Sequence, residues 1–336
     1  MKKELIISNN EKIKLPYVLI TPDDYDRDSH LFVELSSVKP NDGTVLDQMN
    51  ELIEENTGNS MNYTLHALFE ELKYPIIIPI IPRAKNFNAP YLSSFVLNND
   101  FTRCDVTEEE KELLRDVPLQ VKLMIEEAID RLGLTKKAIL KGYSSTAKFA
   151  SQFSVLYPEV VDMTICGGTA GLSTLPIASY NGMELPYPIG VADVPNFNKE
   201  EWMKIRHFLY IGDEDNNNPA LPKCEMGEDF DPNGNRLPKL DSEGNLTFIR
   251  DSDGLLLPTY DDLYTKEQIN IIHNFYGDNN QERFKKNEEI YHELGVDSVH
   301  KMYPGNHITL FRNNRETIIS DIVGFIKEAY KKTRGI

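Results

Sequence analysis

Short apolar runs alternate along the chain with longer segments in which apolar residues recur every three or four positions. The short runs predict buried strands, and the longer periodic segments predict amphipathic helices. Elements that alternate in this way are typical of a mostly parallel sheet covered by helices on both faces, so the predicted fold class is α/β. The predicted strands are Tyr17–Ile20, Leu31–Leu35, Ile76–Ile81, Ala138–Lys141, Val161–Cys166, Phe208–Ile211 and Ser298–Met302. The predicted helices are Thr44–Glu55, Tyr63–Leu72, Thr107–Leu132, Ser145–Leu156, Lys266–Phe275, Gln281–Leu294 and Glu316–Lys331.

The longest predicted helix contains signals for its own ends. Thr107 and Glu110 have the spacing of a capping box at its start, and Gly133 supplies a stop at its end. Pro118 lies inside the pattern and cannot donate a backbone hydrogen bond, so we expect a kink or a split there.

One segment departs from this alternation. Asp-Pro-Asn-Gly, Asp-Ser-Glu-Gly and Asp-Ser-Asp-Gly begin ten residues apart, at Asp231, Asp241 and Asp251. Asp at the first and Gly at the fourth position suit type I turns between short hairpin strands, so we expect an inserted β-meander at residues 224–260. A calcium loop of the EF-hand type is the alternative, but its sixth position would be Gly rather than Arg236 and its twelfth Glu rather than Ser242. Turns are therefore the preferred interpretation, and no metal site is predicted.

The charge of the chain limits its partners. Its 336 residues include 53 Asp and Glu against 36 Lys and Arg, a formal net charge of −17, and 40% are hydrophobic, which suits a globular core. Such acidity repels phosphate backbones and anionic lipid headgroups, so neither nucleic acid nor a membrane is an expected partner. The longest apolar run, from Pro75 to Pro82, is far shorter than the roughly 20 residues that cross a bilayer.

The amino-terminal sequence predicts an unprocessed, cytoplasmic protein. After Met1-Lys2-Lys3 comes Glu4, and the apolar stretch that follows, Leu5–Ile7, is too short for a secretory leader. The three cysteines are scattered without a Cys-Xaa-Xaa-Cys pair, so neither a disulfide framework nor a zinc site is indicated.

The strongest local signal for chemistry is a predicted strand that runs into Gly142-Tyr143-Ser144 and then directly into a helix. A tight turn of this kind, a nucleophile elbow, exposes the serine hydroxyl above the sheet and aims the helix amino terminus at a developing oxyanion. Thr146 stands where the Gly-Xaa-Ser-Xaa-Gly pattern has its last glycine, which weakens the match. The alternative is an ordinary helix capped by Ser144 or Ser145.

Two later segments supply the partners that a serine nucleophile needs. Serine requires a base within hydrogen-bond reach, and that base requires a carboxylate to fix its tautomer. Asp213 and Asp215 follow one predicted strand, and His307 lies in a loop after another. Asp215 is the preferred acid, because Gly-Xaa-Xaa-Asp is the usual spacing after this strand, and Asp213 is the alternative. Ser144, Asp215 and His307 stand in the order serine, acid, histidine that is typical of α/β-hydrolases.

On these residues the chain resembles the α/β-hydrolase superfamily, in particular serine esterases related to polyhydroxybutyrate depolymerase and feruloyl esterase. The resemblance extends from Pro16 to about Lys331, apart from the meander. Its further segments are Leu31–Ser37, similar to the third strand and oxyanion loop, Ile76–Arg83, similar to the fourth strand, and Tyr187–Asp193 and Tyr210–Asn217, similar to blocks of a bacterial branch. It implies a single domain over residues 1–336 with a lid-like excursion at 168–206.

The resemblance also implies the remaining parts of the site. The backbone N–H of Ser145 would be the first oxyanion donor, and Ser37 would supply the second, although Ser36-Ser37 replace the usual His-Gly or Gly-Gly pair. Substrates bind at the carboxyl ends of the strands in open α/β sheets, which gives further candidates close to such ends. The candidate substrate-binding residues are Arg83, Asn86, Tyr91 and Tyr143.

The implied function is hydrolysis of a carboxylic ester, or an amide, through an acyl-serine intermediate without a cofactor. The substrate would be a small-molecule or polymer ester. A serine peptidase of the prolyl-oligopeptidase type is one alternative, disfavoured because no propeller precedes the domain. The other is a non-catalytic binding or adhesion protein whose acidic meander contacts a partner.

Overall fold

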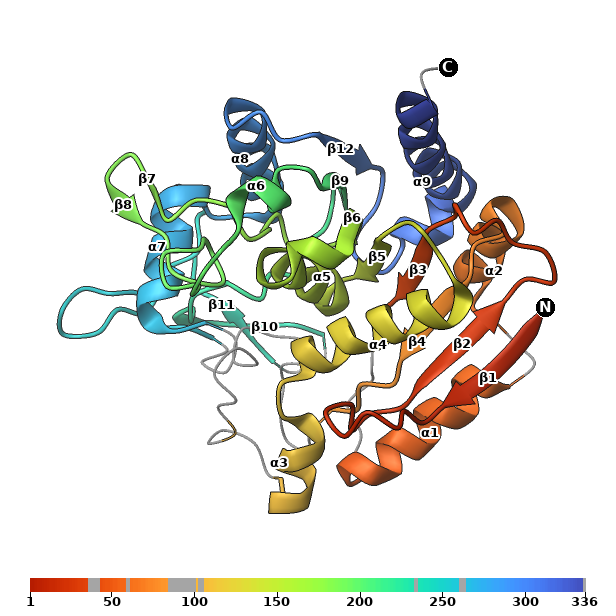
Figure 1. The fold of residues 1–336 in the computed structure, drawn as a ribbon. Coiled ribbons are helices and arrows are strands. Elements are labelled where there is room, and N and C mark those ends of the chain that lie inside the picture. The colour runs from red at the N-terminus through yellow and green to blue at the C-terminus, as the bar shows by residue number, and fades with distance from the viewer. Residues whose placement is uncertain are drawn as a thin grey trace.

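The computed structural model describes residues 1–35, 43–58, 61–83, 101, 106–232, 235–259 and 264–334. Among these residues, eight strands form one sheet in the order β1-β2-β4-β3-β5-β6-β9-β12 (Figure 1). Strand β2 is antiparallel to both of its neighbours, and all other neighbours in the sheet are parallel. This arrangement confirms the predicted α/β-hydrolase fold. The strands are β1 Lys2–Ile6, β2 Tyr17–Thr21, β3 Leu31–Glu34, β4 Ile76–Pro79, β5 Ala138–Tyr143, β6 Val161–Gly167, β9 Arg206–Gly212 and β12 Ser298–Tyr303.

The helices follow the predicted periodic segments closely. Thr107 and Glu110 form the predicted capping box, and Gly133 ends its helix with a left-handed φ of 63°. The long pattern is split where Pro118 was expected to break it, into one helix that ends at Leu114 and another that begins at Val117. The helices are α1 Val45–Thr57, α2 Tyr63–Leu72, α3 Glu108–Leu114, α4 Val117–Leu132, α5 Ser145–Leu156, α6 Lys199–Trp202, α7 Lys266–Tyr276, α8 Asn280–Glu293 and α9 Leu310–Arg334, with a 3₁₀ turn at Pro158–Val160.

Two apolar layers cover the two faces of the sheet. Successive strand residues point to opposite faces, so Leu140 of β5 belongs to one layer and Ile139 to the other. Helices α4 and α5 pack on the first face, and α2 and α9 pack on the second (Figure 1). The sheet is therefore buried on both sides, and its polar chemistry is concentrated at the strand ends.

One strand of the main sheet and one of its covering helices differ from the predictions. Strand β1 was not predicted, because Lys2–Ile6 is largely polar and only Ile6 is fully buried. Helix α9 was predicted from Glu316 but begins at Leu310 and is kinked at Asn314, whose φ of −126° is not helical. The Asn306 carbonyl accepts a hydrogen bond from Leu310 N, which starts the helix before the pattern becomes apolar.

The ten-residue repeat forms a series of short hairpins that begins with β10 Met226–Phe230 and β11 Arg236–Pro238. Asp241 Oδ1 accepts hydrogen bonds from the backbone N–H groups of Glu243 and Asn245, both 2.9 Å long. Gly244 and Gly254 adopt φ values of 87° and 80°, which a turn of this kind requires. These contacts confirm the turn prediction for the described residues. The boundaries 224–260 of the insert stay a prediction.

The segment 168–206 contains the small hairpin β7 Ser179–Tyr180 and β8 Met183–Glu184, followed by α6. Its apolar side chains Leu172, Leu175, Leu185 and Ile189 are buried in the first core layer. A lid role for this segment stays a prediction.

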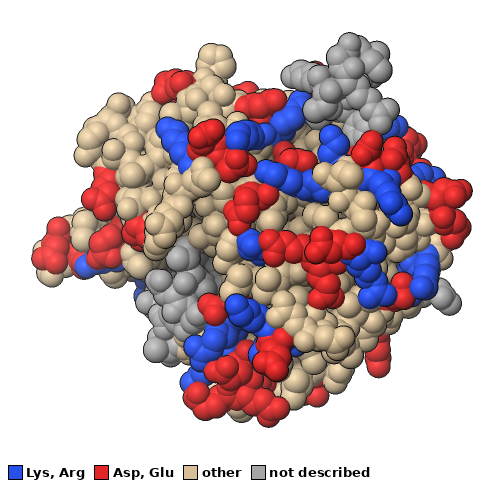
Figure 2. All heavy atoms as spheres, viewed as in Figure 1, with Lys and Arg blue, Asp and Glu red and all other residues tan. Residues whose placement is uncertain are grey.

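On the face of the molecule seen in Figure 2, acidic side chains are interleaved with Lys and Arg. No helix in the described ranges combines the length and the apolar composition that a membrane crossing requires.

Candidate active site

Ser144 occupies the turn between β5 and α5. Its φ of 62° and ψ of −124° lie in a region that residues other than glycine rarely adopt, and this conformation turns the chain sharply from strand into helix. Gly142 makes the turn possible, because a Cβ there would lie 2.4 Å from the Thr146 backbone. The local geometry is that of the predicted nucleophile elbow.

Thr146 closes this turn with its side chain. Its hydroxyl accepts a hydrogen bond from Tyr143 N and donates one to Tyr143 O, each 2.9 Å long. A threonine in place of the usual glycine therefore adds two hydrogen bonds to the backbone of this elbow.

The structure brings together the predicted acid and base. His307 Nδ1 lies 2.8 Å from Asp215 Oδ2, and the Asp215 side chain is fully buried whereas that of His307 is 16% exposed. A carboxylate at Nδ1 places the ring proton there, so Nε2 keeps the lone pair that a general base needs.

Asp215 is held by a network of donors. Its Oδ1 accepts hydrogen bonds from Asn217 N at 3.0 Å and from Asn280 Nδ2 at 3.3 Å. Asp213, the alternative acid, is exposed and accepts a hydrogen bond from Gly305 N at 2.8 Å. Asp213 therefore anchors the loop that carries His307, and the contact with the imidazole belongs to Asp215.

Tyr143 connects the elbow to the histidine loop. Its hydroxyl donates a 2.6 Å hydrogen bond to His307 O, and the two rings lie 5.0 Å apart between centroids. Burial, and secondarily the Asp215 carboxylate, raises the pKa of Tyr143, so this hydroxyl remains a donor. Sequence reasoning placed Tyr143 among the substrate-binding candidates, whereas the structure uses its hydroxyl to position His307.

His307 lies close to the segment of backbone that is hydrogen-bonded to Ser144. Ser144 N donates a 2.8 Å hydrogen bond to Gly167 O, and a Cβ on the next residue, Gly168, would lie 3.0 Å from His307 Cε1. Ser144 Oγ makes no hydrogen bond with a described residue, and the contact between nucleophile and base in such sites often tightens only when substrate binds.

Of the two predicted oxyanion donors, Ser145 lies in the described part of the chain and Ser37 does not. Ser145 is the first residue of α5, and none of the described residues accepts a hydrogen bond from its backbone N–H. That N–H, at the positive end of the helix dipole, is available to a developing negative charge. Ser37 lies outside the described residues.

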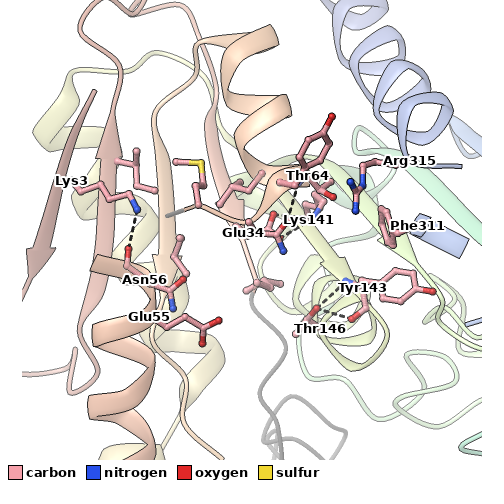
Figure 3. A pocket seen from close by; sticks show the side chains of 17 residues that line it. Lys3, Glu34, Glu55, Asn56, Thr64, Lys141, Tyr143, Thr146, Phe311 and Arg315 are labelled. Atoms are coloured by element: carbon pink, nitrogen blue, oxygen red, sulfur yellow. Dashed lines mark hydrogen bonds and ion pairs between the residues drawn. The ribbon is translucent and has the colours of Figure 1, made fainter. Parts of the chain in front are cut away.

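Only two of the four predicted substrate-binding residues, Arg83 and Tyr143, lie among the described residues. Asn86 and Tyr91 lie outside the described residues, and Arg83 is buried, with its backbone N–H donating to Gln48 Oε1. Tyr143 and Thr146 line a cavity of about 680 Å³ beside the elbow (Figure 3). Arg83 does not line this cavity.

One feature of the site had no sequence signal. Glu34 and Lys141 form a buried ion pair in the wall of the cavity, with Nζ–O distances of 2.8 and 3.0 Å. In sequence both residues look like ordinary strand charges, and only the register of β3 against β5 places them opposite each other. Within the described ranges, no group of three or more His, Cys, Asp or Glu side chains is arranged to hold a metal ion.

Among the comparisons with known proteins, only the search of solved structures finds similar chains. No protein-family model and no curated protein sequence matches the chain. The poly(3-hydroxybutyrate) depolymerase LpqC from Bordetella parapertussis has a TM-score of 0.49 at 11% identity, over 98% of this chain and 89% of that one. Est1E from Butyrivibrio proteoclasticus has a TM-score of 0.42 at 10% identity, over 97% and 98% of the two chains. A carboxylesterase from Mesorhizobium loti has a TM-score of 0.41 at 13% identity, over 90% and 91%. Function must be argued from the site itself.

Proposed function

We propose that this chain is a serine hydrolase that cleaves a carboxylic ester through an acyl-serine intermediate. The observation that carries the proposal is the 2.8 Å hydrogen bond between His307 and the buried Asp215, next to a serine in a strained elbow. An isolated surface serine would need none of this arrangement. A fixed imidazole beside a half-buried strand-to-helix turn is what serine requires to become a nucleophile at neutral pH.

In the proposed reaction, Ser144 Oγ attacks the ester carbonyl carbon while His307 Nε2 takes the hydroxyl proton. The carbonyl oxygen becomes an oxyanion, which the Ser145 N–H stabilises. The carbon–oxygen bond to the alcohol then breaks, and His307 returns the proton to the leaving alcohol. Water hydrolyses the acyl-serine by the same sequence, with His307 again as base and then as acid. Asp215 stays ionised and stabilises the imidazolium throughout.

A fluorophosphonate probe, followed by mapping of the labelled peptide, tests the proposal in one step. The probe should label Ser144, and Ser144→Ala should lose the label and ~10⁴-fold to 10⁶-fold in kcat on a short-chain aryl ester. Ser145→Ala is the matched control: it removes a neighbouring hydroxyl but keeps the backbone N–H, so labelling at Ser144 should persist. A folded protein that takes no label, or takes it at another serine, would contradict the proposal.

A further inference from the structure

The cavity beside the elbow lies between the sheet and helices α1, α2 and α9 (Figure 3). Its volume of about 680 Å³ is within the range of small-molecule sites, roughly 300–1,000 Å³. Tyr143 and Thr146 contribute to its wall, and they flank Ser144 in the sequence. This end of the cavity therefore adjoins the turn that carries Ser144, although Ser144 does not itself line the cavity.

A charged pair occupies the wall of this cavity. Glu34 and Lys141 are only 8% and 4% exposed. Burial raises the pKa of Glu34, and the Lys141 ammonium acts against that shift. Removing two charges from water costs about as much as their attraction returns, so stability alone does not account for the pair. An ammonium has three N–H donors, and no described residue other than Glu34 accepts from Lys141 Nζ.

A second cation lies at the same end of the cavity. Arg315 is four residues after Phe311 on α9, and Phe311 packs edge-on against Tyr143 with ring centroids 4.9 Å apart. The Arg315 guanidinium carbon lies 4.3 Å from the centroid of the Tyr63 ring. No carboxylate among the described residues pairs with Arg315, although the chain carries 53 acidic residues. This cation–π contact holds the guanidinium near the Tyr63 ring and leaves its N–H groups for another acceptor.

The other charges of the cavity lie at its far end. Lys3 Nζ donates to the carbonyl oxygens of Asn56 and Gly58, at 3.5 and 2.7 Å. Glu55 lies beside Asn56 in Figure 3, away from Arg315. The end of the cavity near the nucleophile therefore offers two cationic donors and one carboxylate, and that carboxylate is already neutralised by Lys141.

We propose that this cavity is a subsite for a carboxylate on the acyl part of the substrate, bound by Arg315 and by the remaining N–H of Lys141. The preferred substrates would then be monoesters of dicarboxylic acids. A guanidinium and a carboxylate match in geometry and form strong charge-assisted hydrogen bonds. The inference rests on the proposed function, because it assumes that Ser144 attacks the ester end of the same molecule.

Two aryl esters of equal chain length test this subsite. The 4-nitrophenyl monoester of glutaric acid carries a carboxylate where 4-nitrophenyl valerate carries a methyl group. Arg315→Leu should lower the glutarate-to-valerate ratio of kcat/KM about tenfold to a hundredfold, mainly through KM. Arg315→Lys should restore part of the ratio. Arg312→Leu, an exposed arginine on the same helix that does not line the cavity, is the control and should leave the ratio unchanged.

Binding of glutarate itself separates this inference from the proposed function. Titration calorimetry should detect glutarate binding to the wild-type chain and to Ser144→Ala, with weaker binding in Arg315→Leu and at higher salt. If neither ester is hydrolysed but glutarate binds through Arg315, the proposed function fails and the subsite stands. If the esters are hydrolysed with a ratio that Arg315→Leu does not change, the subsite proposal is overturned and the hydrolase proposal is not.

Discussion

Replacing Thr146 by valine removes the hydroxyl that closes the elbow while nearly preserving the shape of the side chain. Thr146 is fully buried, and its hydroxyl makes hydrogen bonds with both Tyr143 N and Tyr143 O. A buried hydrogen bond contributes about 0.5–1.5 kcal/mol net, so the loss of these two bonds in Thr146→Val should lower the free energy of unfolding by on the order of 1–3 kcal/mol. Thr146→Ser keeps the hydroxyl and loses one methyl group, so its loss should be only about 1 kcal/mol.

Urea unfolding of the two variants measures this difference, with an unchanged m-value as the sign that only stability has changed. The valine variant should also lose turnover of a short-chain aryl ester, because Tyr143 is bonded at one end to the elbow and at the other to His307 O. Equal unfolding free energies for Thr146→Val and Thr146→Ser would show that the hydroxyl does not hold the turn.

Three further outcomes follow from the same geometry. Asp215→Asn should lower kcat about 10³-fold to 10⁴-fold, because the amide favours the wrong imidazole tautomer, whereas Asp213→Asn should cost far less in parallel kinetics; the reverse order would assign the acid role to Asp213. Excess chelator should leave the melting temperature unchanged, since Asp241 and Asp251 use their carboxylates on turn N–H groups; a calcium-dependent rise would contradict this. Burial lowers the pKa of His300 to about 4, whereas a histidine in the unfolded chain has a pKa near 6.5. As the pH falls, the unfolded chain therefore binds the proton before the folded chain does. The free energy of unfolding should decrease as the pH drops from about 6.5 to about 4. His300→Gln should show a smaller fall in melting temperature over that interval, and parallel curves would exclude His300 as a cause.

Sequence patterns predicted the elements whose residues carry their own signal. The apolar runs of β3, β4 and β5 are buried over most of their length, so each can be recognised without knowledge of its neighbours. The elbow was recognisable for the same reason, because Gly142 and Ser144 lie within one short turn. Strand β1 gave no such signal, since its place in the sheet depends on pairing with β2.

Contacts between distant segments explain what the sequence could not predict. The Tyr143 hydroxyl meets a carbonyl 164 residues away, and Glu34 meets Lys141 across 107 residues. Both contacts depend on the register of neighbouring strands and the path of a loop, which no local periodicity encodes. The spacing from the strand end favoured Asp215 over Asp213, and the burial of Asp215 and its contact with His307 agree with that preference, whereas its role as the acid stays a prediction.

The backbone conformation of Ser144 has a consequence for anyone who engineers this protein. A residue other than glycine at φ 62° and ψ −124° stores strain of about 1–3 kcal/mol, which glycine would relieve. Ser144→Gly should therefore match or exceed the wild type in heat resistance while lacking the proposed nucleophile. Directed evolution that selects only for heat resistance would favour this variant, which the proposed function predicts to be inactive, so every round needs a turnover screen. At this position the strained backbone conformation means that a substitution that raises thermal stability is expected to lower activity.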